Sequence, residues 1–337
     1  MKVLVIGGTK FFGKAIVRQL LDAGHKVSIF SRGNQRPEFL DQVEHIAGDR
    51  TNFSEFKSKL QKRTFDIVID NIAFNANEVQ SALDTFAGNV KRYVFTSTGS
   101  LYGTMTARKP IREEDVNFKF QPPEKERDQF VWTYTMGKLQ AEKALLDQDK
   151  IEFTIIRPPM VLGPEDVSLR GYFYFQRLLD KRPLILTNGG FQSFRMAYSE
   201  DLAKGYLLAM KSKRAIGQTY NIAQQEVITL RELLEEAAKV FGVETNFVDI
   251  PYKTMSESGF QYPEPYSVLQ NFIPDLSKAE RDLSYTSTTF SDWIAKTALW
   301  HRDVYRGKDS SNYENRAKEV DFAERFQQIV SSLKTKS

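Results

Sequence analysis

The sequence contains no cysteine and only three histidines in 337 residues. The absence of cysteine excludes disulfide bonds, thiolate metal sites and cysteine nucleophiles. His25, His45 and His301 are scattered without the spacing of a zinc site, so we expect no bound metal. No apolar stretch is long enough to span a membrane, and the N-terminus lacks the apolar core and cleavage site of a signal peptide. We therefore expect a cytoplasmic protein that does not enter a membrane.

An excess of one charge is also lacking. The 47 lysines and arginines nearly balance the 43 aspartates and glutamates, for a net charge of +4. Basic residues gather in two short clusters, at 57–63 and 211–214, and such runs are more often solvated faces than binding patches. Because the excess is small and spread along the chain, we do not expect nucleic acid to be the partner.

Short apolar runs alternate with helical patterns over the first half of the chain. Strands are predicted at 2–6, 26–30, 43–47, 65–70, 92–97 and 152–157. Helices are predicted at 11–23, 53–61, 76–88 and 128–147. This alternation is typical of an α/β fold with a Rossmann-type doubly wound parallel sheet. The polar, proline-containing segment 103–127 interrupts it and is predicted to be a surface loop that covers a site.

The alternation of strand and helix patterns becomes less regular after residue 160, which suggests a division of the chain. Residues 1–160 form the predicted Rossmann domain, with core strands also recruited from about 184–222. Residues 161–302 are predicted to form mainly a smaller mixed α/β C-terminal lobe. The charged tail 303–337 carries apolar residues on one helical face, so it is expected to be a helix that docks on the body or on a second subunit.

A glycine-rich turn follows the first predicted strand and reads Gly7-Gly8-Thr9-Lys10-Phe11-Phe12-Gly13. Gly7 permits the tight turn, and Gly13 lets the following helix approach the sheet. The helix N-terminus presents free N–H groups to a pyrophosphate. Because a strand precedes this turn and a helix follows it at the start of the chain, the motif predicts that residues 1–160 bind a dinucleotide.

The second strand ends with Ser31 and Arg32, where an NAD site normally has an acidic residue for the ribose 2′-hydroxyl. Arginine suits a 2′-phosphate by its charge and by its planar set of donors. Lys10 adds a second cation in the glycine turn. NADP(H) is therefore the expected cofactor, with NAD(H) as the second option; the alternative for Arg32 is a solvated loop arginine.

Tyr134 and Lys138 are four residues apart, which places both on one face of the predicted helix 128–147. A nearby ammonium favours the phenolate and lowers the pKa of a tyrosine, which suits proton transfer. Thr98 and Ser100 lie just past the strand at 92–97, where open α/β sheets place their ligands. A hydroxyl there can hold a substrate oxygen, although serine and threonine also serve such turns by local hydrogen bonding.

These motifs resemble the extended short-chain dehydrogenases/reductases, also called the NAD-dependent epimerase/dehydratase family. The resemblance runs from Met1 to about Arg302. It also rests on Leu101-Tyr102-Gly103, Arg157-Pro158-Pro159-Met160-Val161-Leu162-Gly163-Pro164, Tyr198-Ser199-Glu200-Asp201-Leu202-Ala203, Tyr220-Asn221-Ile222 and Asp275-Leu276-Ser277-Lys278-Ala279. It implies that Thr98, Tyr134 and Lys138 are catalytic, with Lys138 binding the ribose. Together with the residues above, the cofactor candidates are Gly7, Thr9, Lys10, Phe11, Phe12, Gly13, Ser31, Arg32, Asp49 at the adenine, Ala73 and Pro158 near the nicotinamide, Tyr134 and Lys138.

The chain departs from the family pattern where substrates bind. Gly99 and Ser100 replace the acidic pair of the family's dehydratases, so dehydration is not expected. Met160 stands where epimerases usually have asparagine, and Phe194 where they usually have arginine, with Arg195 adjacent. Ser100, Met160 and Arg195 are the candidate substrate contacts. The glycine turn with its lysine also resembles an atypical branch that includes plastid stem-loop RNA-binding proteins.

The resemblance implies a homodimer built through two helices per subunit and a small-molecule substrate. The first hypothesis is an enzyme that uses NADP(H) to reduce or epimerise a sugar or sugar nucleotide, with Tyr134 as acid/base. Two alternatives stay open on the same fold. One is an RNA-binding protein, and the other is an NADP(H)-sensing protein without turnover.

Overall fold

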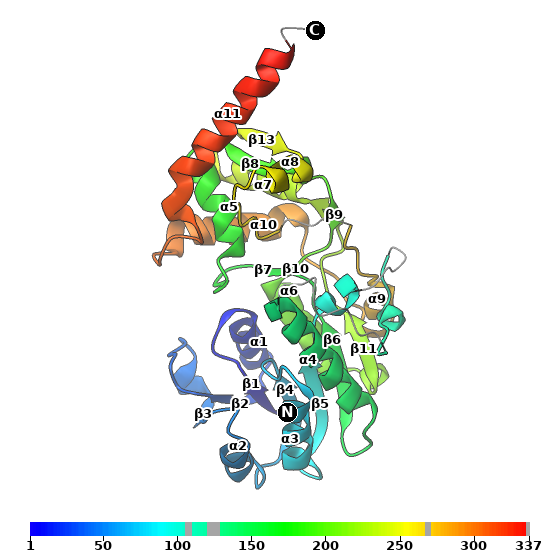
Figure 1. Cartoon of the computed structure of the whole chain (residues 1–337). Helices are drawn as coiled ribbons and strands as arrows, with labels where there is room; N and C mark the ends of the chain where they lie inside the picture. The colour runs from blue at the N-terminus through cyan, green and yellow to red at the C-terminus, as the bar shows by residue number, and fades with distance from the viewer. Residues whose placement is uncertain (105–109, 120–128, 267–270, 335–337) are drawn as a thin grey trace. The chain divides into compact units, whose positions relative to one another are not determined.

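The computed structural model describes residues 1–104, 110–119, 129–266 and 271–334, which fold into two compact units (Figure 1). The first unit comprises Met1–Val161, Met196–Gln225 and Pro274–Ser287. The second comprises Leu162–Arg195, Glu226–Ile273 and Thr288–Ser337. The chain therefore crosses between the units several times.

The described elements lie close to those predicted from the sequence. The strands are β1 Lys2–Ile6, β2 Lys26–Ser31, β3 Glu44–Ala47, β4 Phe65–Asp70, β5 Val90–Thr96, β6 Glu152–Arg157, β7 Val161–Leu162, β8 Leu184–Thr187, β9 Ser193–Phe194, β10 Ala197–Tyr198, β11 Gln218–Asn221, β12 Ile228–Thr229 and β13 Phe247–Ile250. The helices are α1 Phe11–Asp22, α2 Phe53–Leu60, α3 Ala76–Phe86, α4 Gln129–Leu146, α5 Arg170–Leu179, α6 Ser199–Lys211, α7 Leu230–Phe241, α8 Tyr252–Glu257, α9 Ser277–Leu283, α10 Phe290–Leu299 and α11 Arg316–Lys334.

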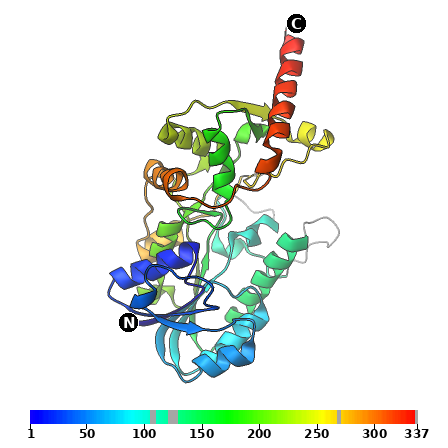
Figure 2. The same cartoon turned by 90° about the vertical axis from the view of Figure 1, so that its left-hand side faces the viewer.

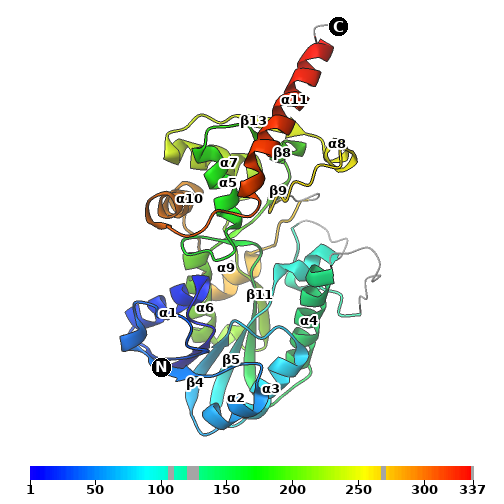
Figure 3. The same cartoon turned by 60° about the vertical axis from the view of Figure 1, so that its left-hand side comes forward.

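The first unit is built on a seven-stranded parallel sheet in the order β11-β6-β5-β4-β1-β2-β3. One apolar core joins the sheet to α1 and α6, and a second joins its other face to α2, α3 and α4 (Figure 3). Because helices cover both faces, the central strands are apolar along almost their whole length, as in β1. The predicted Rossmann-type doubly wound sheet is confirmed.

The order of strands reverses between β1 and β4, because the chain first builds β2 and β3 on one side and then β5 and β6 on the other. Such a reversal leaves an opening outside the carboxyl ends of the two central strands. The turn after β1 and the turn after β4 meet there, since the Asn71 amide donates to the Ile6 carbonyl at 3.0 Å. The topology thus places the glycine-rich turn at the position where this fold binds ligands.

A buried polar network lies at the carboxyl ends of β6 and β11, at one side of the central sheet. Arg157, at the end of β6, forms a two-point ion pair with Glu142 of α4 and donates to the Tyr102 hydroxyl at 2.9 Å. The Tyr102 hydroxyl donates to Asn221 at 2.8 Å, and the Asn221 amide donates to the Glu113 carboxylate at 2.8 Å. Burial raises the pKa of Glu113. Three motifs that carried the family resemblance therefore meet in this network.

The predicted surface loop 103–127 is only partly described. Its residues 105–109 and 120–127 lie outside the described residues. Ile111 is fully buried and bridges to Pro274, and Glu113 is 8% exposed because it holds Asn221. The expectation of a purely superficial excursion was therefore wrong for this part, since both side chains belong to the interior of the first unit.

The second unit combines short strand pairs with helices. β8 pairs in parallel with β13, and β9 pairs antiparallel with β12. Of the segment 184–222, β11 joins the central sheet, whereas β8 does not, because its partner is β13. The expectation that core strands are also recruited from about 184–222 was wrong for β8, at the start of that range.

The tail forms α11, which packs against β8 and β13 through its first turns. Glu319 is fully buried in an ion pair with Arg177 of α5, and Ala323 is fully buried. The last turns extend past the body of the second unit, and Ile329 and Leu333 are 60% and 65% exposed there (Figures 1 and 2). The expected apolar face is thus buried in its first half only.

The Arg157 network yields a prediction about stability. Replacing Arg157 by Met leaves the buried Glu142 carboxylate without its partner, so the free energy of unfolding should fall by about 3–5 kcal/mol. Urea denaturation measures the change. The control is the double variant Glu142→Leu/Arg157→Met, which removes both charges and should recover most of the loss. Equal losses in the single and double variants would contradict this role.

Candidate active site

The glycine-rich turn is held by close backbone contacts. Gly7 has a φ of +86°, and a Cβ added there would lie 2.6 Å from the Ile72 side chain. A Cβ on Gly13 would lie 2.3 Å from the Gly7 carbonyl oxygen, so α1 rests directly on the turn. The residue before α1, Lys10, makes no side-chain capping bond. The first N–H groups of α1 therefore remain open to an anion.

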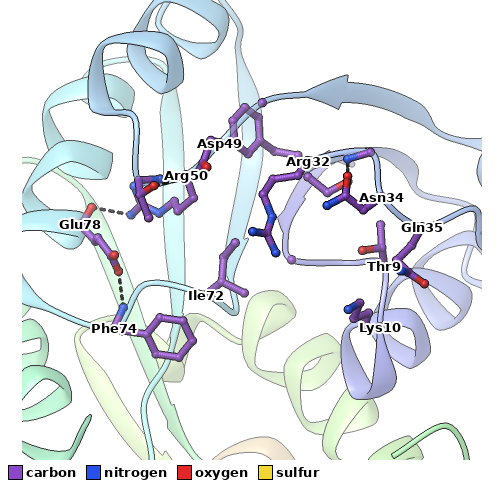
Figure 4. Close-up of a pocket in the computed structure, with 16 residues that line it drawn as sticks. Thr9, Lys10, Arg32, Asn34, Gln35, Asp49, Arg50, Ile72, Phe74 and Glu78 are labelled. Carbon is purple, nitrogen blue, oxygen red and sulfur yellow. Dashed lines mark hydrogen bonds between the residues drawn. The ribbon is translucent and has the colours of Figure 1, made fainter. Parts of the chain in front are cut away.

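A cavity of about 340 Å³ opens beside this turn (Figure 4). It is lined by Gly7, Thr9, Lys10, Phe30, Ser31, Arg32, Gly33, Asn34, Gln35, Gly48, Asp49, Arg50, Thr51, Ile72, Phe74 and Glu78. The structure thus brings together six predicted cofactor candidates from three separate segments. Phe11, Phe12, Gly13, Ala73, Tyr134, Lys138 and Pro158 do not line this cavity.

Two exposed cations face the cavity. Arg32 extends into it from the end of β2, and Lys10 lies across from it at the start of α1 (Figure 4). Both side chains are exposed, and neither forms an ion pair with any residue that the structure describes. Ser31 is held beside them, because its hydroxyl is 3.0 Å from His45 Nε2. This corner can therefore bind a doubly charged anion without breaking an ion pair.

Asp49 lines the cavity from the turn after β3, next to the end of β2, because the Gly48 amide donates to the Ser31 carbonyl at 3.0 Å. One oxygen of its carboxylate accepts bonds from the Thr51 amide at 2.9 Å and from the Thr51 hydroxyl at 2.8 Å. These two bonds, followed by the charge of Arg32, lower the pKa of Asp49. The carboxylate is therefore ionised at neutral pH, and its second oxygen is available to accept a further bond.

A buried polar cluster below the cavity was missed in the sequence. Asp70, fully buried at the end of β4, accepts bonds from the amides of Ile72 and Ala73 at 3.1 and 3.0 Å. Its other oxygen accepts from Arg50 at 3.2 Å and from the Tyr93 hydroxyl at 2.7 Å. An acidic residue closing an otherwise apolar strand was the one signal that could have pointed to it.

The predicted pair on α4 lies beside the same turn. The Lys138 side chain is fully buried, and its ammonium donates to the carbonyls of Ala73 at 2.8 Å and Thr96 at 2.6 Å. Burial lowers the pKa of Lys138 to about 8. Tyr134 is half-buried, with its ring centroid 5.9 Å from the Lys138 Nζ atom. The spacing of four residues thus puts both groups on one face, as predicted.

The close approach of α4 depends on a glycine between the two. A Cβ on Gly137 would lie 2.5 Å from the Phe74 carbonyl oxygen. That residue type lets the helix carrying Tyr134 and Lys138 pack directly on the turn after β4.

The turn after β5 holds the third predicted catalytic residue. The Thr98 hydroxyl donates to the Ser100 hydroxyl at 3.0 Å and accepts from the Ser100 amide at 3.1 Å. The Gly99 amide donates to the Pro158 carbonyl at 2.7 Å, which brings Pro158 beside this turn. Of the other substrate candidates, Met160 lies in the first unit, whereas Arg195 belongs to the second.

The sequence pattern of the NAD dependent epimerase/dehydratase family matches residues 3–223. The chain belongs to this family. Membership places it among the oxidoreductases and epimerases of the short-chain dehydrogenase/reductase type. The match includes all seven strands of the central sheet except the first residue of β1.

One similar protein of the plant chloroplast is named for stem-loop binding. The chain is 29% identical over 254 residues to the chloroplast stem-loop binding protein of 41 kDa b from Arabidopsis thaliana. That match covers 72% of this chain and 63% of the relative, so the chain spans less than two thirds of that protein's length.

Solved structures of the family share the fold. UDP-glucose 4-epimerase from Thermotoga maritima, with UDP-glucose, has a TM-score of 0.72 at 18% identity, covering 90% of this chain and 99% of its own. UDP-glucuronic acid 4-epimerase from Bacillus cereus, in complex with NAD, has a TM-score of 0.68 at 20% identity, covering 91% and 99%.

The described residues, 1–104, 110–119, 129–266 and 271–334, offer neither a membrane span nor a cluster of metal ligands. Over these ranges, the helices are all too short or too polar to cross a membrane. Within the same part of the chain, histidine and acidic side chains form no group of three that could hold a metal ion.

The contact at Gly137 yields a prediction. Gly137→Ala should force α4 away from Phe74 and displace Lys138 from its two carbonyl partners, so dinucleotide affinity should fall together with the thermal midpoint. A cost of about 1–3 kcal/mol is expected for such overpacking. Thr133→Ala, on the exposed side of the same helix, is the control and should change neither quantity. Unchanged binding and unfolding in Gly137→Ala would show that α4 has room to move.

Proposed function

We propose that the chain is an NADP(H)-dependent oxidoreductase that reduces or epimerises a sugar or sugar nucleotide, with Tyr134 as its acid/base. The observation that carries the cofactor choice is the pair of cations, Arg32 and Lys10, that face one cavity without an ion-pair partner among the described residues. A ribose 2′-phosphate is the part of NADP(H) that two cations bind and that NAD(H) lacks.

The remaining cavity residues suit the rest of the dinucleotide. The open N-terminus of α1 would receive the pyrophosphate. The unbonded oxygen of Asp49 would accept a bond from the adenine amino group, and Ala73 and Pro158 would flank the nicotinamide. When bound, the nicotinamide supplies or accepts the hydride.

Tyr134 would carry out the proton transfer. During reduction its hydroxyl would donate a proton to the substrate oxygen, and during oxidation its phenolate would take that proton back. A charged Lys138 stabilises the phenolate and so favours both directions near neutral pH. The Thr98 hydroxyl would hold the substrate oxygen, turning from Ser100 to do so.

The proposed substrate class rests on the similar solved structures and on the positions where this chain departs from the family pattern. Both solved neighbours are named for UDP-sugar substrates. Gly99 and Ser100 provide no acid or base for elimination of water, which favours reduction or epimerisation over dehydration.

We propose a homodimer through α4, supported by Phe130 and Val131, whose side chains are 79% and 51% exposed.

RNA binding is the second candidate, because of the likeness to a stem-loop binding protein. The basic cluster 57–63 supports it weakly. Lys59 pairs with Glu55 at 2.7 Å and Arg63 with Glu44 at 2.5 Å, so half of its four cations are neutralised. A bound RNA would show an affinity that falls steeply with salt.

Arg32→Ala tests the cofactor assignment. Loss of charged hydrogen bonds to a 2′-phosphate should weaken NADPH binding by roughly 10- to 100-fold and leave NADH binding nearly unchanged. Calorimetric titration with both dinucleotides measures this. Arg36→Ala, an exposed arginine outside the cavity, is the matched control and should bind like the wild type. A wild type that binds neither dinucleotide would overturn the oxidoreductase proposal and turn attention to RNA.

Tyr134→Phe tests the chemistry. Removing the hydroxyl should lower kcat by about 10²- to 10⁴-fold while NADPH affinity stays within a few-fold. A screen of keto-sugars and sugar nucleotides, followed by NADPH absorbance, supplies the assay, and Tyr252→Phe in the second unit is the control. NADPH binding with no turnover of any substrate by the wild type would favour an NADP(H)-sensing protein instead.

A further inference from the structure

The ammonium of Lys138 is closed off on every side that the structure describes. Two of its protons are taken by the carbonyls of Ala73 and Thr96. Aromatic rings cover the rest: the centroids of Phe74 and Phe95 lie 4.8 and 4.9 Å from Nζ. The Tyr134 ring follows at 5.9 Å, and the lysine has no exposed surface. A ribose hydroxyl therefore cannot reach this ammonium until one ring moves.

Phe74 is the ring that can move. Phe95 is fully buried in the core of the sheet, and Tyr134 is half-buried. Phe74 is 46% exposed, lines the cofactor cavity, and projects into the site below Ile72 (Figure 4). An apolar ring with so much exposed surface loses little packing when it turns.

The backbone of Phe74 is held while its side chain is not. Its amide donates to the Glu78 carboxylate at the start of α3. Its carbonyl oxygen lies against Gly137, where even a Cβ would not fit. Movement is thus confined to the side-chain torsions, which turn within nanoseconds in exposed residues.

We propose that Phe74 is a gate over Lys138, closed in the free protein and turned aside when the dinucleotide binds. This inference rests on the proposed function and on the expectation from the family resemblance that Lys138 binds the cofactor ribose. Phe74 acts through Lys138 and is therefore a positioning residue. The closed ring keeps water from the ammonium, and the open ring frees its third proton for the ribose.

The gate also affects the charge of Lys138. Burial lowers the pKa of Lys138 to about 8, against the opposing charges of Asp70, Glu78 and Glu142. Opening the gate hydrates the ammonium and so raises this pKa. In the wild type, dinucleotide affinity should therefore fall as the pH rises through about 8. Without the ring, the fall should move to higher pH.

The first experiment needs no cofactor. The free protein is treated with formaldehyde and a borane reductant, which methylate accessible amines, and methylation of Lys138 is followed by peptide mass spectrometry. Phe74→Ala should raise the rate at Lys138 at least about five-fold, because the reagent then reaches the amine without displacing the ring from its cation–π contact. Phe74→Trp should restore protection. Phe53→Ala, which truncates another exposed phenylalanine (40%), is the control.

The second experiment follows NADPH association by stopped-flow fluorescence. Phe74→Ala should raise the association rate constant about two- to five-fold, and Phe74→Trp should lower it. Urea denaturation confirms that each variant is folded. A wild type that binds no dinucleotide would overturn the proposed function while the methylation result still tests the cover over Lys138.

Two outcomes would overturn the gate itself. In the first, Lys138 is methylated at the same rate with and without the Phe74 ring. In the second, Phe74→Ala unmasks Lys138 but leaves association unchanged or slower, which would make Phe74 a stacking surface for the cofactor.

Discussion

The buried carboxylate of Asp70 is the group on which the site depends. A carboxylate without water is costly unless donors surround it, and here backbone amides, an arginine and a tyrosine hydroxyl supply four bonds. Two of those bonds fix the turn after β4. That turn then does three things: Ile72 packs on Gly7, the Ala73 carbonyl holds Lys138, and Phe74 faces the cavity. The glycine turn and α4 are therefore positioned by one anion.

The same cluster explains why a lysine can be buried here. Lys138 and Arg50 are cations, and Asp70 and Glu78 are carboxylates, so the charges balance in a small volume. Removing any one of them would leave an unpaired buried charge, which costs far more than a surface ion pair is worth. Lys138 still has a lowered pKa, because burial outweighs the attraction of its neighbours. The pKa of Lys138 should therefore change when the side chains that cover its ammonium move.

Several motifs that resemble the family serve architecture instead of chemistry. Tyr102, Arg157 and Asn221 stand in motifs that carried the family resemblance, yet they bond to one another and to Glu142 and Glu113 in the interior. A sequence pattern does not distinguish structural from catalytic roles, because the same residue type, here tyrosine, can serve either one. Burial and partners separate them: Tyr102 is 2% exposed and saturated, whereas Tyr134 is half-buried beside Lys138.

The sequence by itself determined the doubly wound sheet, the glycine turn and the face shared by Tyr134 and Lys138, because these depend on local periodicity and on spacing within one element. The candidate site, including the roles of Thr98, Arg32 and Asp49, stays a prediction. Only the tertiary structure decided that Arg32 and Lys10 face one cavity and that β8 lies outside the central sheet. It also decided that Phe74 and Asp70 belong to the site. These facts depend on which segments meet across the strand reversal, and contacts between residues far apart in the chain leave no periodic trace in the sequence.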